Sequence, residues 1–136
     1  MYTVKEAAKQ LGFTEHTIRF YTDKELVPGV MRDKNNCRLF TEESINWLIG
    51  IKHLKECGMT LEAIKTYIEL CLQGDSTIET RYHIILKQKE IAKCQLEEAK
   101  QRLDYMEKKA ELYQKIMEKH IPDNTNPAKW PVKSAQ

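Results

Sequence analysis

Apolar residues recur at alternating spacings of four and three along the C-terminal half of the chain. The series consists of Ile78, Tyr82, Ile85, Ala92, Leu96, Ala99, Leu103, Met106, Ala110, Tyr113 and Met117, with Lys89 in the one polar place. An alternation sustained over this length is typical of a coiled-coil seam, in which a narrow apolar stripe faces a second helix. These residues, Lys89 included, are called the seam below.

The stretch 75–121 contains neither Gly nor Pro and lies between Gly74 and Pro122. It therefore predicts one helix, about 70 Å long. The alternative is a single amphipathic helix lying across its own domain, but the residues before it are too few to cover it. We expect a homodimer in which Lys89 helps to fix the register. The spacing leaves parallel and antiparallel pairing open. The dimer contact would be formed by Tyr82, Ile85, Leu96, Ala99, Leu103, Met106, Ala110 and Tyr113.

Two short helices are predicted at the N-terminus. Thr3 and Glu6 have the spacing of a capping box, and Gly12 ends the helix that they begin. Thr14 then caps a second helix, from Glu15 to about Lys24. Two short helices joined by a tight turn with glycine form a helix-turn-helix.

The second helix carries more hydrogen-bond donors than a core needs. Ile18 and one of the aromatic residues Phe20 and Tyr21 can pack inward. A helix in the major groove would use the others to reach base edges or phosphates, although a solvated surface position is the simpler role for Arg19. These polar candidates are His16, Thr17 and Arg19.

A hairpin is predicted over Val30–Phe40. Asn35 and Asn36 can form its turn, because asparagine tolerates positive φ. Arg32 and Arg38 flank the turn on opposite arms. A basic β-ribbon that follows a helix-turn-helix is a wing, suited to the DNA backbone or the minor groove.

Two further helices complete the N-terminal part. Thr41 caps one of them and Thr60 caps the other, which runs from Leu61 to Gln73. The third helix is expected to bury Ile45, Leu48, Ile49 and Leu54. The predicted fold is mainly α: a winged helix-turn-helix domain over 1–74, a coiled-coil dimerisation helix over 75–121, and an extended or disordered tail over 122–136.

Composition narrows the function without deciding it. The net charge is +2, from 22 basic and 20 acidic residues, so DNA contacts must come from placed side chains rather than from a diffuse basic field. No apolar run approaches the 20 or so residues that span a bilayer, and the four cysteines are widely spaced, as expected of free thiols in the cytoplasm. No paired carboxylates, nucleophile with base, Gly-rich loop or metal-ligand spacing indicates an enzyme, a cofactor or a metal site.

Four separate motifs, in order and spacing, closely resemble those of the MerR family of bacterial transcription regulators over about residues 2–74. They are Thr17–Tyr21 (TIRFY), Leu26–Pro28 (LVP), Cys37–Phe40 (CRLF) and Gly58–Glu62 (GMTLE). The resemblance implies a dimer, joined by an antiparallel coiled coil, on a pseudo-palindromic operator. It also implies that the protein kinks and untwists promoter DNA on activation, so that RNA polymerase can use a promoter whose elements are spaced too far apart.

By motif position, the resemblance implies that Arg19, Phe20 and Tyr21 contact the recognition site. Arg38 would serve the wing, and Lys55 would hold a phosphate. Three positions depart from the common pattern: Phe20 stands where Tyr is usual, and glycines are replaced by Glu25 and Asn36.

The effector class follows from what the chain shares with branches of this family. Metal-sensing relatives carry cysteines at both ends of the dimer helix, and neither 75–79 nor the tail after Pro122 contains any. Drug-sensing relatives carry a large C-terminal ligand domain, for which fifteen residues are too few. The short form resembles the branch that senses aldehydes or electrophiles through a thiol. The cysteine of that branch aligns near His53, and Cys57 lies one turn later.

Cys57 and His53 are therefore the candidate effector residues, although an inert buried thiol is the simpler role for Cys57, because buried cysteines are common and a helix C-terminus disfavours a thiolate. A rival hypothesis makes the chain a coiled-coil adaptor whose N-terminal domain binds protein instead of DNA. The predicted wing arginines and exposed Arg19 favour DNA.

Overall fold

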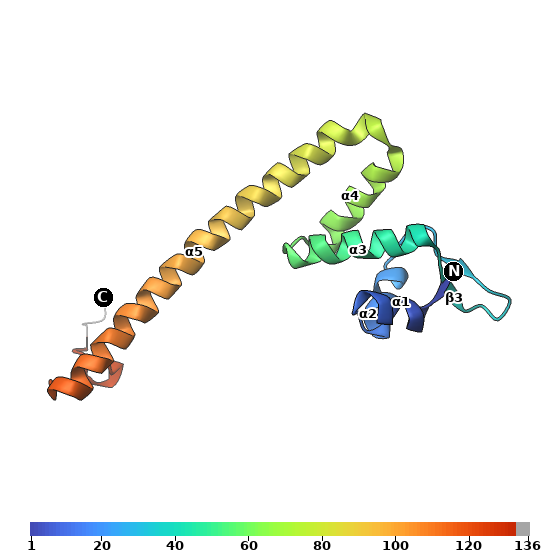
Figure 1. Cartoon of the computed structure of the whole chain (residues 1–136). Coiled ribbons are helices and arrows are strands. Elements are labelled where there is room, and N and C mark those ends of the chain that lie inside the picture. Colours follow the sequence, from blue (N-terminus) through green and yellow to red (C-terminus); the bar gives the residue numbers. More distant parts are fainter. Residues whose placement is uncertain (133–136) are drawn as a thin grey trace. The chain divides into compact units, whose positions relative to one another are not determined.

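The computed structural model describes residues 1–132, which divide into two compact units, one of residues Met1–Gln88 and one that begins at Lys89. Helices dominate, as predicted (Figure 1). None of the helices in the described part has the length and apolar character needed to cross a membrane. The elements are β1 (Tyr2–Thr3), α1 (Val4–Leu11), α2 (Glu15–Asp23), β2 (Met31–Arg32), β3 (Arg38–Phe40), α3 (Glu42–Glu56), α4 (Leu61–Gln73), η1 (Asp75–Thr77), α5 (Ile78–Lys119) and η2 (Pro127–Lys129).

A threonine caps the N-terminus of each of the helices α1 to α4. The four residues Thr3, Thr14, Thr41 and Thr60 each accept a hydrogen bond from the backbone N–H three positions later. At α1 the Glu6 carboxylate accepts in return from the Thr3 N–H at 3.3 Å, which completes the predicted capping box. A cap of this kind stabilises a helix by about 1 kcal/mol. The start of each of these helices is therefore determined by a few neighbouring residues.

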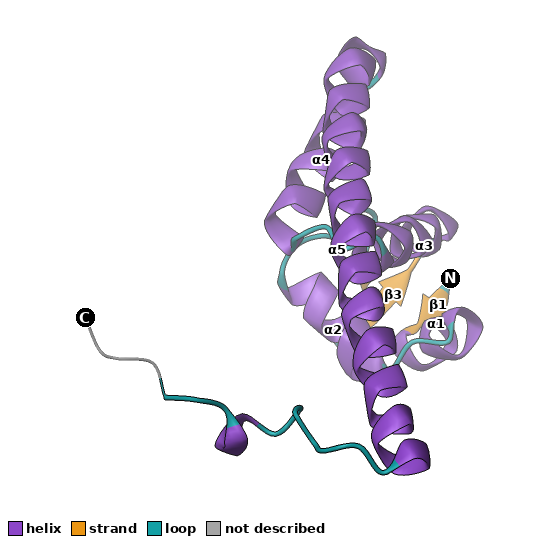
Figure 2. Cartoon of the chain, turned by 90° about the vertical axis from the view of Figure 1, so that its left-hand side faces the viewer, coloured by secondary structure: helices purple, strands orange, loops and turns teal. Residues whose placement is uncertain are grey.

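A small antiparallel sheet joins the N-terminus to the predicted hairpin. Its strand order is β1-β3-β2, with Tyr2 opposite Phe40 and Met31 opposite Leu39. Figure 2 shows β1 and β3 side by side near α1. The strand β1 is too short to give a sequence signal and was not predicted, yet it places the start of α1 against the hairpin.

The core of the first unit is shielded from solvent. Ile18, Phe40 and Leu48 have no exposed surface, and Ile51 retains 1%. Ile49 was predicted to be buried and is 38% exposed. That prediction is wrong because successive helical residues are rotated by about 100°, so Ile49 faces away from the side that carries Leu48.

The first unit extends past Gly74 to Gln88 because the first turns of α5 are fixed to α4. Gly74 has φ of 90° at the junction. The buried Thr77 hydroxyl lies 2.6 Å from the Leu70 carbonyl oxygen and 2.8 Å from that of Gly74. Arg81 donates from Nε to the Thr77 hydroxyl at 3.0 Å, and Ile84 packs on the core.

Part of the tail departs from the predicted extended chain. In Figure 2 it is a loop with one helical turn, η2. The Asp123 carboxylate accepts hydrogen bonds from the Thr125 hydroxyl and N–H, which lower the pKa of Asp123. Trp130 donates from Nε1 to the Asn124 carbonyl at 2.9 Å. The prediction for 133–136 falls outside the described residues.

Candidate nucleic-acid interface

Helix α2 separates its apolar and polar side chains onto different sides. Thr14 accepts from the Thr17 N–H at 3.0 Å, and the two hydroxyls lie 2.8 Å apart, so Thr17 is engaged in the cap. Ile18 is buried, whereas His16 and Arg19 are exposed. The structure thus leaves two of the three predicted polar residues free to face a ligand.

Arg19 has one ion-pair partner, Glu15, one turn earlier on the same helix. Its Nη2 lies 3.2 Å from Glu15 Oε1, and about half of each side chain is exposed to solvent. Exposed pairs at this spacing contribute about 0.3–0.5 kcal/mol. A phosphate or a base edge could replace Glu15 as the partner of Arg19 at little cost.

The two aromatic residues of α2 have different environments. Phe20 is 38% exposed, and Lys24 Nζ lies 5.6 Å from its ring centre. Tyr21 is only 7% exposed and packs edge-on against Phe13, and burial raises the pKa of its hydroxyl. Tyr21 therefore supports α2 from beneath, and only a small part of it is left for the predicted DNA contact.

The hairpin turn is organised by Asp33. Its Oδ1 accepts from the N–H groups of Asn35 at 2.8 Å and Cys37 at 2.9 Å, and its own N–H donates to the Cys37 carbonyl at 2.9 Å. Asn36 takes positive φ of 62°, whereas Asn35 does not, so one of the two predicted residues provides the left-handed position. Arg32 donates from Nη1 to the Asn36 carbonyl at 2.9 Å and remains exposed.

Arg38 is held by an ion pair that the sequence did not predict. Its guanidinium pairs with Asp23 at the C-terminal end of α2, and the Arg38 side chain is only 16% exposed. The Asp23 carboxylate is 62% exposed. This pair fixes the hairpin to α2, and it leaves Arg38 less accessible than Arg32. Sequence reasoning missed Asp23 because only the folded chain brings it beside β3.

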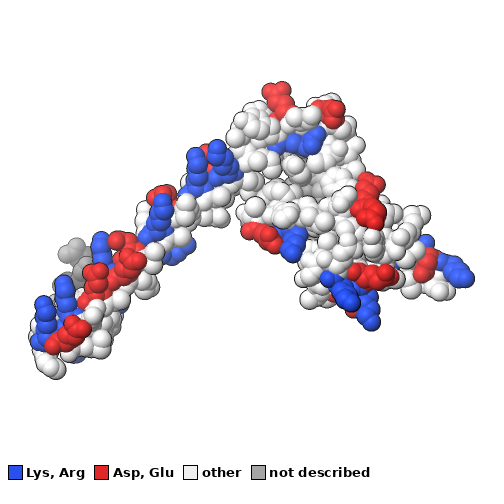
Figure 3. All heavy atoms as spheres, viewed as in Figure 1, with Lys and Arg blue, Asp and Glu red and all other residues white. Residues whose placement is uncertain are grey.

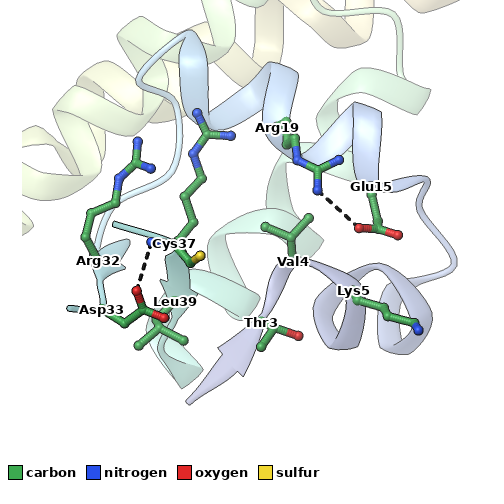
Figure 4. A pocket seen from close by; sticks show the side chains of 10 residues that line it. Thr3, Val4, Lys5, Glu15, Arg19, Arg32, Asp33, Cys37 and Leu39 are labelled. Carbon is green, nitrogen blue, oxygen red and sulfur yellow. Dashed lines mark hydrogen bonds and ion pairs between the residues drawn. The ribbon is translucent and has the colours of Figure 1, made fainter. Parts of the chain in front are cut away.

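The two exposed arginines, Arg19 and Arg32, line one groove. It has a volume of about 450 Å³ and lies between the two helices of the helix-turn-helix and the hairpin. Figure 4 shows Arg19 on α2 and Arg32 on the hairpin at opposite sides of the groove, with Val4 below Arg19. The residues that line it are Thr3, Val4, Lys5, Glu15, Arg19, Arg32, Asp33, Cys37, Arg38 and Leu39. Lys5, which the sequence analysis did not single out, adds a further cation.

Charges outside this groove are of mixed sign on the face that Figure 3 shows. On the face shown in Figure 3, Lys and Arg are interspersed with Asp and Glu over the first unit and along α5. Lys55 is exposed on α3 and lines a second hollow together with Phe13 and Tyr21. Lys52 in that hollow lies 5.5 Å from the centre of the Phe13 ring and donates to the Leu11 carbonyl.

The candidate effector residues lie at the C-terminal end of α3. Cys57 is the C-cap and donates from its N–H to the His53 carbonyl at 3.0 Å. It is exposed, so the expectation of a buried thiol is wrong: the C-cap position lies past the last helical residue, at the surface. His53 is also exposed, and its Nδ1 lies 3.9 Å from Glu56 Oε2. Within residues 1–132, no three His, Cys, Asp or Glu residues are close enough together to hold a metal ion.

The predicted dimer residues are uncovered in the single chain. No residue of α5, which the structure describes in full, is buried. Leu96 is 56% exposed and Leu103 58%, and the alanines of the seam are exposed as well. Within residues 1–132, the apolar stripe therefore has no partner that covers it.

Comparison with known proteins gives consistent results. Residues 2–71 match the family described as "MerR HTH family regulatory protein". An uncharacterised HTH-type transcriptional regulator of Haemophilus influenzae is 40% identical over 114 residues, 84% of each chain. The regulator AdhR of Bacillus subtilis is 34% identical over 87 residues, 64% of this chain and 62% of its own length.

A solved structure extends the likeness to the fold. It is the crystal structure of HiNmlR, described as a MerR family regulator lacking the sensor domain and bound to promoter DNA. The TM-score is 0.72 at 40% identity, and the match covers 85% of this chain and 88% of that one. The regulator in that structure is on DNA, which favours a DNA partner over the adaptor hypothesis.

Proposed function

This chain belongs to the MerR family of helix-turn-helix regulators and is a DNA-binding transcription regulator, and we propose that it acts as a homodimer on a two-part operator within a promoter. One observation carries the proposal. The exposed guanidinium groups of Arg19 and Arg32 lie in one groove, on the two elements that a winged helix-turn-helix presents to DNA.

In this proposal α2 lies in the major groove. His16 and Arg19 are the side chains free to reach base edges, and arginine binds guanine in two-point contacts. Thr17 lies at the N-terminal end of α2, where N–H groups favour a phosphate. Phe20 contributes ring contacts without the hydroxyl of a tyrosine, and Tyr21 supports the helix from below.

The hairpin and α3 supply the backbone contacts. Arg32 reaches the phosphates beside the hairpin, and Arg38 does so while it holds the hairpin to α2 through Asp23. Lys55, exposed on α3, binds a phosphate of the same DNA strand. Contacts of this kind set the position of the protein on DNA and make binding depend on salt.

Replacing the arginines one at a time tests this assignment. Arg19→Ala should weaken operator binding by about 1–3 kcal/mol and relax specificity at one base pair, because a base contact is lost. Arg32→Ala should weaken binding to all sequences and reduce the dependence of the binding constant on salt. Fluorescence anisotropy with operator and scrambled duplexes at several salt concentrations measures both effects.

The Arg38–Asp23 pair supplies a matched control. Arg38→Ala removes both the ion pair and the proposed phosphate contact, whereas Asp23→Asn removes the pair and leaves the guanidinium free. If Arg38 binds a phosphate, Asp23→Asn should retain affinity that Arg38→Ala loses. Equal losses in the two variants would mean that Arg38 only positions the hairpin. Unchanged affinity in Arg19→Ala, Arg32→Ala and Arg38→Ala together would remove the proposed interface.

Promoter distortion is the proposed route to RNA polymerase. Two first units held by one coiled coil bind their half-sites at a fixed separation, so a change in that separation bends or untwists the DNA between them. Transcription in vitro should then depend on the spacing between the promoter elements. A promoter shortened to normal spacing should be transcribed without the protein, and a promoter whose output ignores both spacing and protein would contradict this mechanism.

The proposed signal is an aldehyde or another electrophile that reacts with the exposed Cys57 thiol. Alkylation there would add bulk at the end of α3, beside the turn into α4. His53, one turn earlier, would act as the base that takes up the thiol proton. Support comes from the exposure of both side chains and from their positions one turn apart at the C-terminal end of α3.

Cys57→Ser should abolish transcriptional induction by formaldehyde or N-ethylmaleimide while operator affinity stays unchanged. Cys71→Ser and Cys94→Ser are the matched controls and should respond normally. A Cys57→Ser protein that is still fully induced would place the signal at another residue.

A further inference from the structure

Glu15 places a negative charge in the groove that is proposed to bind DNA. We infer that this carboxylate determines sequence specificity: it accepts a hydrogen bond from the N4 amino group of a cytosine, in the base pair next to the guanine that Arg19 binds. The inference rests on the DNA-binding role proposed above for Arg19. It goes further by assigning a second base pair and the residue that selects it.

The first argument is the charge of the groove. Four cationic residues line it and favour the phosphates of DNA, namely Lys5, Arg19, Arg32 and Arg38. A carboxylate in the same place is repelled by those phosphates, so it weakens binding unless it meets a hydrogen-bond donor. The donors that bases present in the major groove are the amino groups of cytosine and adenine. A base edge is therefore the DNA group that compensates for the charge of Glu15.

The second argument is that Glu15 is available to a ligand, whereas the other carboxylate of the groove is not. Asp33 Oδ1 accepts hydrogen bonds from two backbone N–H groups of the hairpin turn, so Asp33 has a structural role. Glu15 has one side-chain partner among residues 1–132, which is Arg19, at 3.2 Å from Oε1. The Glu15 side chain is 44% exposed. Its second oxygen can thus accept from a base without breaking that contact.

The third argument is the position of Glu15 in α2. It is the first residue of this helix, and the N-terminal residues of a recognition helix are the ones that contact base edges. Arg19 follows one turn later on the same side, whereas Ile18 is buried in the core. A placement of α2 that brings Arg19 to a base therefore brings Glu15 to a base as well.

The fourth argument is distance. The paired atoms of Glu15 and Arg19 are 3.2 Å apart, and Figure 4 shows the two side chains turned toward each other. Successive base pairs follow each other at about 3.4 Å along the DNA axis. An acceptor and a donor at this separation match the N4 amino group of a cytosine and the O6 atom of a guanine on neighbouring pairs. The ion pair of the free protein thus has the spacing of the proposed base contacts.

A purely structural role for Glu15 makes a different prediction. A carboxylate in the first turn of a helix is stabilised by the helix dipole, and Glu62 lies in the first turn of α4 as Glu15 does in α2. Glu62 is exposed and is not among the residues that line the groove. Glu62→Gln is therefore a matched control for Glu15→Gln, because each removes one negative charge from a first turn. The two should differ in their effect on base preference.

The base edges give an order of preference at the position assigned to Glu15. Cytosine presents its amino donor and should bind best. Adenine presents an amino donor beside the N7 acceptor and should come second. Guanine and thymine present acceptors there, which a carboxylate repels. Replacing the cytosine by thymine should therefore weaken binding about 10-fold to 100-fold.

Selection from a random duplex library by the full-length chain tests the inference. The same selection is carried out with Glu15→Ala, Glu15→Gln, Arg19→Ala and Glu62→Gln, and fluorescence anisotropy then measures affinities for single-base variants of the selected half-site. Arg19→Ala should lose the preference for one guanine. Glu15→Ala should keep that guanine and lose the preference for the neighbouring cytosine. Glu15→Gln should shift this position toward adenine, which an amide binds in two-point contacts, and Glu62→Gln should select the original half-site.

Modified bases in the selected half-site give an independent readout. N4-Methylcytosine keeps the base pair but places a methyl group where the amino N–H faces the major groove. At the assigned position it should weaken binding of the original chain about 10-fold and leave Glu15→Ala unaffected. 7-Deazaguanine at the neighbouring pair lacks the N7 acceptor. It should weaken the original chain and Glu15→Ala alike, and it should leave Arg19→Ala unaffected.

The outcomes separate this inference from the proposed function. Loss of the guanine preference instead of the cytosine preference in Glu15→Ala would make Glu15 a positioning residue for Arg19. An unchanged half-site in both Glu15 variants, or a half-site without cytosine beside that guanine, would leave Glu15 without a base contact. Each of these results overturns the inference and keeps the role of Arg19. A selection that recovers no preferred sequence, or Arg19→Ala that selects the original half-site, would overturn the proposed base contact of Arg19 itself.

Discussion

The first unit and helix α5 contain similar apolar residues and use them in opposite ways. In the first unit Ile18, Phe40 and Leu48 are fully buried by other parts of the same chain. In α5 the leucines Leu96 and Leu103 are more than half exposed. The difference lies in periodicity, because several short helices can surround one core whereas a single long stripe needs a second long surface. One region is stabilised within the chain, and the proposed dimer would make the stability of the other depend on protein concentration.

Leu103→Lys should have the largest effect, because it should prevent dimerisation through the seam of α5. It would place two unpaired ammonium groups in the dimer contact, and each carries a desolvation penalty of several kcal/mol. The protein should sediment as a monomer at micromolar concentration. Operator binding should also be lost far beyond any loss in a single first unit, because two half-sites can no longer be held together.

The matched control is Glu98→Lys, which adds the same charge outside the seam and should leave the dimer intact. A Leu103→Lys protein that is still dimeric would mean that the seam is misassigned.

Phe40→Ala tests the other side of the comparison. Phe40 has no exposed surface and lies in the central strand β3, so its truncation should lower the free energy of unfolding by about 3–5 kcal/mol. Urea unfolding of the first unit, followed by the fluorescence of Trp47, measures the loss. The loss should be the same at low and high protein concentration, and a loss that shrinks as concentration rises would contradict an intrachain core.

Glu25→Gly should give a small gain in the stability of the first unit. Glu25 has φ of 58° at the C-terminal end of α2, with its N–H bonded to the Thr22 carbonyl. The equivalent turns after α1 and α3 use Gly12 and Gly58. Left-handed backbone costs a side-chain-bearing residue about 1–2 kcal/mol, so glycine should raise the free energy of unfolding by about 0.5–1 kcal/mol after its own entropy cost is subtracted.

Asn36→Gly is the companion measurement. Asn36 also has positive φ, but asparagine tolerates this conformation better than glutamate does. Its gain should therefore be smaller than that of Glu25→Gly. The reverse order in urea unfolding would show that the turn after α2 is not strained.

Features set by neighbouring residues could be predicted from the sequence, and features set by distant residues could not. The caps at Thr3, Thr14, Thr41 and Thr60 were predicted correctly because each depends on a few adjacent positions. The strand β1 was missed because two residues carry no period, and its pairing with β3 is a long-range contact.

The site shows the same division. The exposure of His16 and Arg19 followed from helical spacing around the buried Ile18. The partner of Arg38 did not, because Asp23 and Arg38 meet only after the hairpin has folded onto α2. The choice between Phe20 and Tyr21 as the inward aromatic was left open by the sequence, and it depended on where Phe13 lies.

The ion pair between Arg38 and Asp23 has a consequence for operator evolution. Because it ties the hairpin to α2, a shift of one element on the proposed DNA site would be transmitted to the other. Base substitutions under the hairpin and under α2 should then change the binding free energy non-additively, so a scoring matrix that treats operator positions as independent would misrank double substitutions. The operators of this protein would be expected to drift in correlated pairs of positions rather than one base pair at a time.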